Sequence, residues 1–363
     1  MKKNKNYMDL KDQPVPEGQH LLEVDDLKMY FHTEDGVVRA VDGVSYTLDR
    51  GETLGVVGES GSGKSVTAMT IMGLISMPPG KIEGGDVRYR GRSILEMTEE
   101  EMQHIRGNDI AMIFQDPMTS LNPVYKIGKQ VGEGLRLHRG YSKQEALKRA
   151  TELLDLVGIP EPEKRVNEYP HQFSGGMRQR VMIAMALACD PDILIADEPT
   201  TALDVTIQAQ IIELMQEMQE KNGNAIIMIT HDLGVVADMA DKIMVMYAGR
   251  PVEFGTAEEI FYESRHPYTW GLIRSIPEQA IDEKKPLTPI HGNPPSLMNL
   301  PEGCVFSPRC PYATDKCRKQ RPERVVTESG HYSACHYSGD PEFLKNAPET
   351  SRTRKDSKKG GEA

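Results

Sequence analysis

The stretch Gly58-Glu59-Ser60-Gly61-Ser62-Gly63-Lys64-Ser65 has the pattern G-x-x-x-x-G-K-[ST], which is typical of a phosphate-binding loop. Residues 53–57 before it read as a short buried strand, and residues 66–74 after it have the small and apolar composition of a helix packed on a sheet. We expect the backbone N–H groups of the loop and the positive end of the helix dipole to face a polyphosphate. Lys64 is predicted to reach the β- and γ-phosphates and the Ser65 hydroxyl to hold Mg²⁺.

The chain length and charge exclude some functions. With 363 residues, the chain is long enough to bury a core without disulfide staples. A net charge of −11 and a pI near 5.5 argue against a nucleic-acid binder that works through a global positive field. The basic start lacks the apolar core of a signal peptide, and the apolar runs are much shorter than the roughly 20 residues of a membrane helix. We therefore expect a cytoplasmic protein that reaches any membrane through a partner.

Four continuous apolar runs indicate strands that are buried on both faces of a parallel sheet. Each ends at polar residues suited to phosphate chemistry. The run 53–57 ends in the glycine loop, 111–114 in Gln115-Asp116, 193–196 in Asp197-Glu198, and 225–230 in His231-Asp232. Since ligands of open α/β sheets bind at the carboxyl ends of the strands, one nucleotide site is predicted to collect all four.

The residue types at these strand ends match phosphoryl-transfer chemistry. Asp197 is predicted to hold Mg²⁺, directly or through water, and Glu198 to orient and deprotonate an attacking water. Gln115 is predicted to bridge metal and water, and His231 to donate to the γ-phosphate. Taken singly, these residues could equally be strand-end caps, a helix N-terminal residue and solvated loop charges. Their joint occurrence at four strand ends favours the functional interpretation.

The N-terminal part is predicted to form an antiparallel β region. Residues 1–20 are polar and read as a mobile tail. Four short strands follow, at 21–24, 27–31, 37–41 and 44–48. Tyr30 or Phe31 is a candidate for contact with an adenine ring, although a lone aromatic in a strand is more often a packing residue.

A helical insert lies between Gln115 and Asp197. Ser142 and Glu145 form a capping box, and Gly158 is the expected stop of the helix that follows. Farther on, Ser174-Gly175-Gly176 opens a helix that runs to about residue 188. Such a helix start is either a second anion site or an ordinary N-cap.

The composition changes after about residue 263, where prolines interrupt regular structure. Four of the five cysteines then follow, with the spacing Cys304-x5-Cys310-Pro311-x5-Cys317-x17-Cys335. In a cytosolic chain this clustering favours a metal over disulfides. The closely spaced cysteine pairs of structural zinc sites are absent, and cysteine followed by proline occurs in some iron–sulfur proteins. The spacing leaves zinc, an iron–sulfur centre and free thiols open.

The stretch Phe173-Ser174-Gly175-Gly176-Met177 resembles the signature motif of ATP-binding-cassette (ABC) ATPases. Phenylalanine replaces the usual leucine, and methionine replaces the usual glutamine. Ala202-Leu203-Asp204 resembles the dimer-contact loop of that family, and His231 its switch histidine. With the glycine loop, Gln115 and the 197–198 pair, the whole set occurs in order over residues 21 to about 260.

Other stretches resemble the ATPase subunits of bacterial oligopeptide, dipeptide and nickel importers. These stretches are 114–123, 169–180, 266–269 and 304–311. The resemblance implies an α/β fold, namely a P-loop ABC nucleotide-binding domain with a parallel-sheet core, an antiparallel β region and a helical subdomain. It also implies a small cysteine-containing C-terminal region. The implied divisions are a tail at 1–20, an ABC ATPase domain at 21–262 with its helical subdomain at about 117–190, a cysteine-containing region at 263–340 and a tail at 341–363.

The resemblance also assigns site residues. Besides the glycine loop, it places these residues at the nucleotide: Phe31, Thr67, Ser174, Gly175, Gly176, Met177 and Asp204. Ser65, Gln115 and Asp197 are implied at Mg²⁺, and Gln115, Glu198 and His231 in catalysis. For the four cysteines the resemblance favours a [4Fe-4S] cluster over zinc, with a structural role.

The resemblance also implies partners, because each subunit of such ATPases supplies only half of a nucleotide site. The signature of one subunit closes on ATP held by the glycine loop of another, so two ATP molecules lie in a head-to-tail dimer. This chain has one set of motifs, so a second ATPase subunit is implied, by resemblance a different chain. Two membrane permeases, which contact the surface around 119–125, and an extracytoplasmic peptide-binding protein complete the implied importer at the cytoplasmic face of the membrane. A soluble ABC ATPase acting as a mechanical switch on DNA or ribosomes, a metal or redox sensor and a nickel importer are the alternatives.

Overall fold

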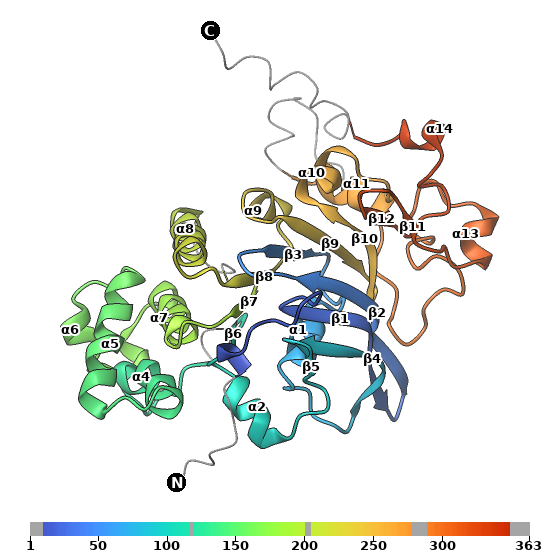
Figure 1. The fold of residues 1–363 in the computed structure, drawn as a ribbon. Coiled ribbons are helices and arrows are strands. Elements are labelled where there is room, and N and C mark those ends of the chain that lie inside the picture. The colour runs from blue at the N-terminus through green and yellow to red at the C-terminus, as the bar shows by residue number, and fades with distance from the viewer. Residues whose placement is uncertain (1–9, 117–119, 200–204, 277–288, 349–363) are drawn as a thin grey trace.

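The structure is a computed structural model that describes residues 10–116, 120–199, 205–276 and 289–348. Its first sheet has four strands in the order β2-β1-β4-β5 and is antiparallel. The strands are β1 (Leu22–Thr33), β2 (Gly36–Leu48), β4 (Gly80–Tyr89) and β5 (Arg92–Ser93). A short 3-10 helix, η1 (Leu10–Asp12), precedes this sheet in the chain. In Figure 1 the sheet lies beside β3 and β9.

The four short N-terminal strands of the prediction are two long ones. The expected break after Val24 is a β-bulge in β1, where Asp26 takes a left-handed φ of 43° and the pairing with β2 shifts register. On the opposite strand, Gly43 has a φ of 87° and is skipped in the register between Asp42 and Val44. Asp and Gly residues tolerate such conformations, so Asp26 and Gly43, which lie in the gaps between the predicted strands, produce bulges within continuous strands.

The second sheet has eight strands in the order β11-β12-β10-β9-β3-β8-β7-β6. The five from β9 to β6 are parallel, and β10, β12 and β11 are added antiparallel. The strands are β3 (Thr53–Val57), β6 (Ile110–Ile113), β7 (Ile193–Asp197), β8 (Ala225–Thr230), β9 (Lys242–Tyr247), β10 (Arg250–Thr256), β11 (Val325–Val326) and β12 (Tyr332–Ser333). Every residue of β3, β6, β7 and β8 is buried, as the continuous apolar runs predict.

The helical insert forms a group of its own, at the left of Figure 1. It contains α4 (Ile127–His138), α5 (Lys143–Leu156), α6 (Pro162–Arg165), η2 (Pro170–Gln172) and α7 (Gly175–Leu187). The predicted capping box is present, because the Ser142 side chain accepts from the Glu145 backbone and the Glu145 side chain accepts from the Ser142 backbone. Leu153, Leu154, Val181 and Ile183 are buried in one core with the parallel strands.

The remaining helices cover the sheets or follow them. They are α1 (Lys64–Ile71), α2 (Glu99–Ile105), α8 (Val205–Asn222), α9 (Leu233–Ala237), α10 (Ala257–Tyr262), α11 (Pro267–Arg274), α13 (Asp315–Lys319) and α14 (Pro341–Leu344). Helix α1 ends before the predicted residue 74, because Gly73 takes a φ of 60° and Leu74 is exposed. None of the helices in the described ranges has the length and apolar composition needed to span a bilayer.

The cysteine-containing region packs directly on the cassette, on the right of Figure 1. Its strand β12 pairs with β10 and so extends the large sheet. Phe306 is buried between two tyrosines, with ring centroids 5.2 Å from Tyr247 and 5.3 Å from Tyr268. The fully buried Glu253 of β10 lies 3.1 Å from His331 Nε2. The C-terminal region therefore continues the hydrophobic core of the nucleotide-binding fold.

Candidate functional site

The glycine loop 58–65 connects β3 to α1, as predicted. Gly63 is the N-cap of α1 with a φ of 100°, and a Cβ there would lie 2.3 Å from the Ala40 carbonyl oxygen. A Cβ at Gly58 would lie 2.2 Å from the Met246 carbonyl oxygen. Only glycine fits these two positions. Since no side chain caps α1, its first N–H groups remain available to an anion.

Three polar side chains, those of Lys64, Thr67 and Ser62, lie in the loop and the first turn of α1. Lys64 is buried, and its Nζ donates to the carbonyl oxygens of Gly58 at 2.7 Å and Glu59 at 3.0 Å. Thr67 Oγ1 donates back to the Gly63 carbonyl at 3.0 Å. The buried Ser62 hydroxyl has no hydrogen-bond partner among the described residues. An unpaired buried hydroxyl and a desolvated ammonium both gain from a polyphosphate ligand.

The predicted polar residues at the strand ends are brought together. In the large sheet β3, β8, β7 and β6 are adjacent, so their carboxyl ends share one edge. Ser65 Oγ donates to Asp197 Oδ1 at 2.9 Å, and Gln115 Nε2 donates to Glu198 Oε2 at 3.0 Å. His231 Nδ1 lies 3.5 Å from Glu198 Oε1, and its side chain is 63% exposed. These contacts connect residues from all four strand ends.

Burial shapes the electrostatics of this edge. Asp197 is 2% exposed, and desolvation by burial raises the pKa of its carboxyl. Desolvation likewise lowers the pKa of the Lys64 ammonium. Both charges are therefore costly in the protein alone, and a bound cation beside Asp197 and a bound anion beside Lys64 would offset the cost. The oxygen ligands of Ser65 and Asp197 suit Mg²⁺.

The turn after β7 is held in a strained conformation. Glu198 has a φ of 47°, a left-handed value that is uncommon for a residue with a side chain. Its backbone N–H donates to the Ile229 carbonyl at 2.9 Å. On the other side of the turn, the buried Gln179 of α7 donates to the Pro199 carbonyl at 2.6 Å. Gln179 lies in the stretch 169–180 that carried the importer resemblance but was not predicted at the site, because its partner Pro199 is 20 residues away in the sequence.

The helix start at Ser174 is an N-cap, which both interpretations of this stretch predict. Ser174 is the N-cap of α7, and its Oγ accepts from the Met177 N–H at 3.3 Å. Ser174 and Gly175 are exposed, and a Cβ at Gly175 would meet no atom within 4 Å. Gly176 and Met177 are half-buried. The helix start is therefore open to a second molecule.

Phe31 lies in β1, opposite Val38 of β2 and Gly80 of β4, and packs partly against the core. The neighbouring Tyr30 uses its hydroxyl to donate to Asp42 at 3.0 Å. Other predicted contacts lie outside the described residues. They are the dimer-contact residue Asp204 with its neighbours 202 and 203, and residue 119 of the permease-contact surface.

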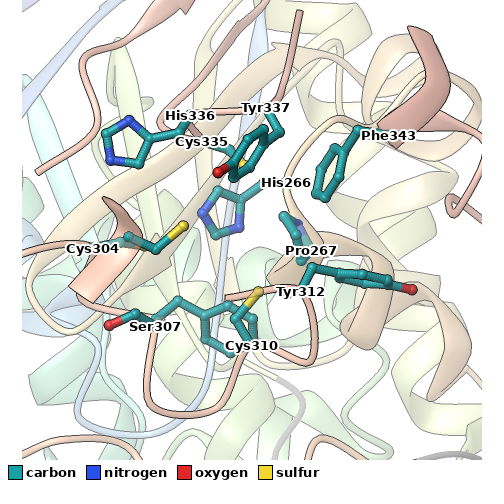
Figure 2. Close-up of a pocket in the computed structure, with 12 residues that line it drawn as sticks. His266, Pro267, Cys304, Ser307, Cys310, Tyr312, Cys335, His336, Tyr337 and Phe343 are labelled. Atoms are coloured by element: carbon teal, nitrogen blue, oxygen red, sulfur yellow. The ribbon is translucent and has the colours of Figure 1, made fainter. Parts of the chain in front are cut away.

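The four clustered cysteines line one pocket, together with His266, Pro267, Phe306, Tyr312, Tyr337 and Phe343. Figure 2 shows the sulfur atoms of Cys304 and Cys310 directed at the space beside His266. Burial raises the pKa of Cys310 to about 11 and that of Cys335 to about 12. Across the described ranges, no three His, Cys, Asp or Glu side chains are close enough to hold a single metal ion.

Two residues of the C-terminal region contact the glycine loop without having been predicted there. The Tyr268 hydroxyl accepts from the Glu59 N–H at 2.9 Å, and Arg309 forms a two-point ion pair with the Glu59 carboxylate. Both lie in stretches that carried the importer resemblance. Their contact partner could not be read from the sequence, because 250 residues separate Arg309 from Glu59.

Four features together define an ABC ATPase: the strand order, the glycine loop, the acidic pair at the end of β7 and the open start of α7. Residues 41–201 match the family described as ABC transporter, and residues 252–317 match the oligopeptide/dipeptide transporter C-terminal region. The chain belongs to the oligopeptide and dipeptide transport family of ABC ATP-binding proteins, as its relatives establish.

Two of these relatives show the family membership. The oligopeptide transport ATP-binding protein OppD of Bacillus subtilis (strain 168) is 58% identical over 86% of this chain and 87% of its own length. The dipeptide transport ATP-binding protein DppD of Escherichia coli (strain K12) is 52% identical over 88% of this chain and 97% of its own. Among solved structures, the dimeric post-hydrolysis state of the ATP-binding cassette MJ0796 with ADP and Pi superposes with a TM-score of 0.60 at 29% identity. The superposition covers 65% of this chain and 98% of the MJ0796 chain.

Proposed function

We propose that this chain is the ATP-hydrolysing, energy-coupling subunit of an importer of dipeptides or oligopeptides, located at the cytoplasmic face of the membrane. The observation that carries the proposal is the shared edge where Ser65 contacts Asp197 and Gln115 contacts Glu198. The relatives named for peptide transport match both the cassette and the C-terminal region.

The proposed roles of the residues follow from their positions. The loop 58–65 and Thr67 hold the phosphates, with Lys64 moving from the Gly58 and Glu59 carbonyls to the phosphate oxygens. Ser65, Gln115 and Asp197 hold Mg²⁺, which neutralises phosphate charge when bound. Glu198 accepts the proton of the attacking water.

Two further residues complete the proposed nucleotide site. His231 is exposed at the mouth of the site, 3.5 Å from Glu198, and donates to the γ-phosphate. The aromatic ring of Phe31 stacks on the adenine, since it lies in the sheet next to the loop and is only partly covered by the core.

We further propose that the site is half of a shared one. Ser174, Gly175, Gly176 and Met177 would close on ATP held by a second ATPase subunit, with Asp204 at the contact between the two. The exposure of Ser174 and Gly175 supports this, because an N-cap with free space around it accepts an anion from outside the chain. We propose a different ATPase chain as partner, together with two permeases and an extracytoplasmic peptide-binding protein.

For the cysteine pocket we propose a [4Fe-4S] cluster with a structural role. Four thiols from three chain segments line one pocket inside an aromatic shell, and this donor set fits either a cluster or zinc. The backbone N–H groups of Phe306, Tyr312 and Tyr337 point at the sulfurs of Cys304, Cys310 and Cys335, respectively. In a cluster each cysteine binds its own iron, so the thiols need not converge on one point. We favour the cluster over zinc because Cys310 is followed by proline, as in some iron–sulfur proteins.

The experiment compares the chain with its Glu198→Gln variant. We expect the variant to bind ATP with unchanged affinity and to lose nearly all hydrolysis, because an amide cannot accept the proton. The tagged chain is expected to co-purify with integral membrane subunits and to show peptide-stimulated hydrolysis in vesicles. Full activity of the variant would refute the assignment of the base. Co-purification with soluble proteins only would favour a mechanical switch, and stimulation by nickel but not by peptide would favour a nickel importer.

A further inference from the structure

Arg309 connects the cysteine-containing region to the glycine loop. Its side chain is 4% exposed and faces Glu59, which is the second residue of the loop. Arg309 Nη1 lies 2.5 Å from Glu59 Oε2, and Nη2 lies 3.0 Å from Oε1. This two-point geometry fixes the carboxylate in one orientation, which a single contact would not do.

The Arg309 guanidinium is itself held on every side. Nε donates to the His291 carbonyl at 2.9 Å, Nη2 to the Ile290 carbonyl at 3.1 Å, and Nη1 to the Tyr247 hydroxyl at 3.3 Å. With the two bonds to Glu59, each of the five N–H groups of the guanidinium has an acceptor. The ion pair is therefore preorganised by the protein, in contrast to an exposed pair, whose side chains must be ordered as it forms.

Both ends of the Glu59 peptide are occupied as well. The Glu59 N–H donates to the Tyr268 hydroxyl at 2.9 Å, and the Glu59 carbonyl accepts from Lys64 Nζ at 3.0 Å. The N–H and the side chain of Glu59 are thus fixed by the C-terminal region. Its carbonyl is bound within the loop, by Lys64 and by the Ser62 N–H at 3.2 Å, and Lys64 is the residue that would leave it for a phosphate.

We propose that Arg309 is a positioning residue of the phosphate loop, and that the C-terminal region is therefore part of the nucleotide-binding site. Two physical effects support the proposal. The ion pair fixes Glu59, and hence the loop, while Lys64 exchanges carbonyl oxygens for phosphate. The guanidinium also neutralises a carboxylate that would otherwise repel a polyphosphate from the loop.

The turn around Cys310 sets the position of Arg309. The N–H groups of Arg309 and Cys310 both donate to the Phe306 carbonyl at 3.0 Å. The Phe306 ring in turn packs between Tyr247 and Tyr268, which are the two tyrosines that contact Arg309 and Glu59. The cysteine turn is therefore connected to the phosphate loop directly through Arg309 and indirectly through Tyr268, on which Phe306 packs.

The test measures ATP binding by the full chain and the steady-state kinetics of the assembled transporter. For Arg309→Ala we expect the KM for ATP and the Kd of the chain for ATP to rise about tenfold, with kcat changed about twofold or less. Arg309→Lys keeps the charge but not the fork, so it should recover part of the affinity. Arg318→Ala is the matched control. Like Arg309, Arg318 is the neighbour of a pocket cysteine, Cys317, but its side chain forms an exposed ion pair with Asp315.

A double-mutant cycle separates positioning from general destabilisation. Glu59→Gln should weaken ATP binding like Arg309→Ala, and the double variant should be no weaker than either single variant. A wild-type KM in Arg309→Ala, an additive double variant, or a lowered Tm without a change in Kd would overturn the proposal. The proposal rests on ATP hydrolysis by this chain. If the wild-type transporter did not hydrolyse ATP, the proposed function would fail, whereas an active transporter insensitive to Arg309 would refute this inference alone.

Discussion

The side-chain nitrogen of Gln115 lies 3.0 Å from Glu198 Oε2, so the ends of the neighbouring strands β6 and β7 are joined through the two side chains proposed to act on water. The contact binds one oxygen of the Glu198 carboxylate, and the Glu198 backbone is strained. An amide at this position donates to a carboxylate without competing for the proton.

From this contact we predict that Gln115→Ala lowers kcat by roughly tenfold to a hundredfold, as expected for a residue that orients a ligand or a base. The KM for ATP should change little. Gln115→Glu should lower kcat further, because it places a second carboxylate against Glu198. The measurement is steady-state hydrolysis by the assembled transporter over a range of ATP concentrations. Equal kcat values for the two variants would contradict the orienting role.

Asp197 illustrates the conflict between stability and function at this edge. Its carboxyl is buried, and desolvation raises its pKa, so the ionised form is held at a cost. In Asp197→Asn the Ser65 hydroxyl retains an acceptor while the buried charge is removed. We predict that this variant is stabilised by about 1 kcal/mol in the absence of Mg²⁺.

The same Asp197→Asn variant should lose most of its ATP hydrolysis, because an amide is a poor ligand for Mg²⁺. Chemical denaturation without nucleotide gives the stability, and hydrolysis at saturating Mg²⁺ gives the activity. Lower stability in Asp197→Asn than in wild type would show that the ionised carboxylate contributes favourably to the fold.

Much of the site could be predicted because its chemistry is local in sequence. A buried parallel strand imposes a continuous apolar run, and its carboxyl end places the next polar residue at the edge of the sheet. Gln115, Asp197 and His231 were therefore predictable as a group. The caps at Ser142 and Ser174 were predictable for the same reason, because a cap is satisfied within three residues.

The contacts that could not be predicted are those between distant segments. Arg309 lies in an irregular turn, and no helix or strand pattern in the sequence indicates that it contacts Glu59. The bulges at Asp26 and Gly43 were read as strand breaks, because the left-handed conformation that favours these residues occurs in turns and bulges alike. Both the Arg309 contact and the bulges depend on which distant segment packs against or pairs with these residues, and the local sequence does not specify that segment.

We predict that the chain purified without oxygen contains about four iron atoms and absorbs broadly in the visible range, with loss of that absorbance on reduction. Cys310→Ser should lose most of the iron, because it removes one of the four thiols that line the pocket. Cys189→Ala is the control, since Cys189 is buried elsewhere, in the core under the helical insert. Elemental analysis decides the metal, and zinc without iron in the wild-type chain would refute the cluster.

The two serine caps provide a matched pair for testing the half-site proposal. Ser142 Oγ accepts from the Glu145 N–H at 3.3 Å, and Ser174 Oγ accepts from the Met177 N–H at the same 3.3 Å. Replacing either serine by alanine removes one helix cap, so each variant should lose about 1 kcal/mol of stability. We predict that only Ser174→Ala lowers ATP hydrolysis by the assembled transporter, by about tenfold or more.

In the isolated chain, ATP affinity should be unchanged in both cap variants, because the proposed nucleotide site of one chain contains neither Ser142 nor Ser174. Ser174 would contact the γ-phosphate held by the partner ATPase, whose hydrolysis the assembled assay also reports. Weaker ATP binding by isolated Ser174→Ala would mean that the signature acts on its own chain's nucleotide. Equal loss of hydrolysis in the two variants would mean that the serine serves the fold of the helical insert and nothing more.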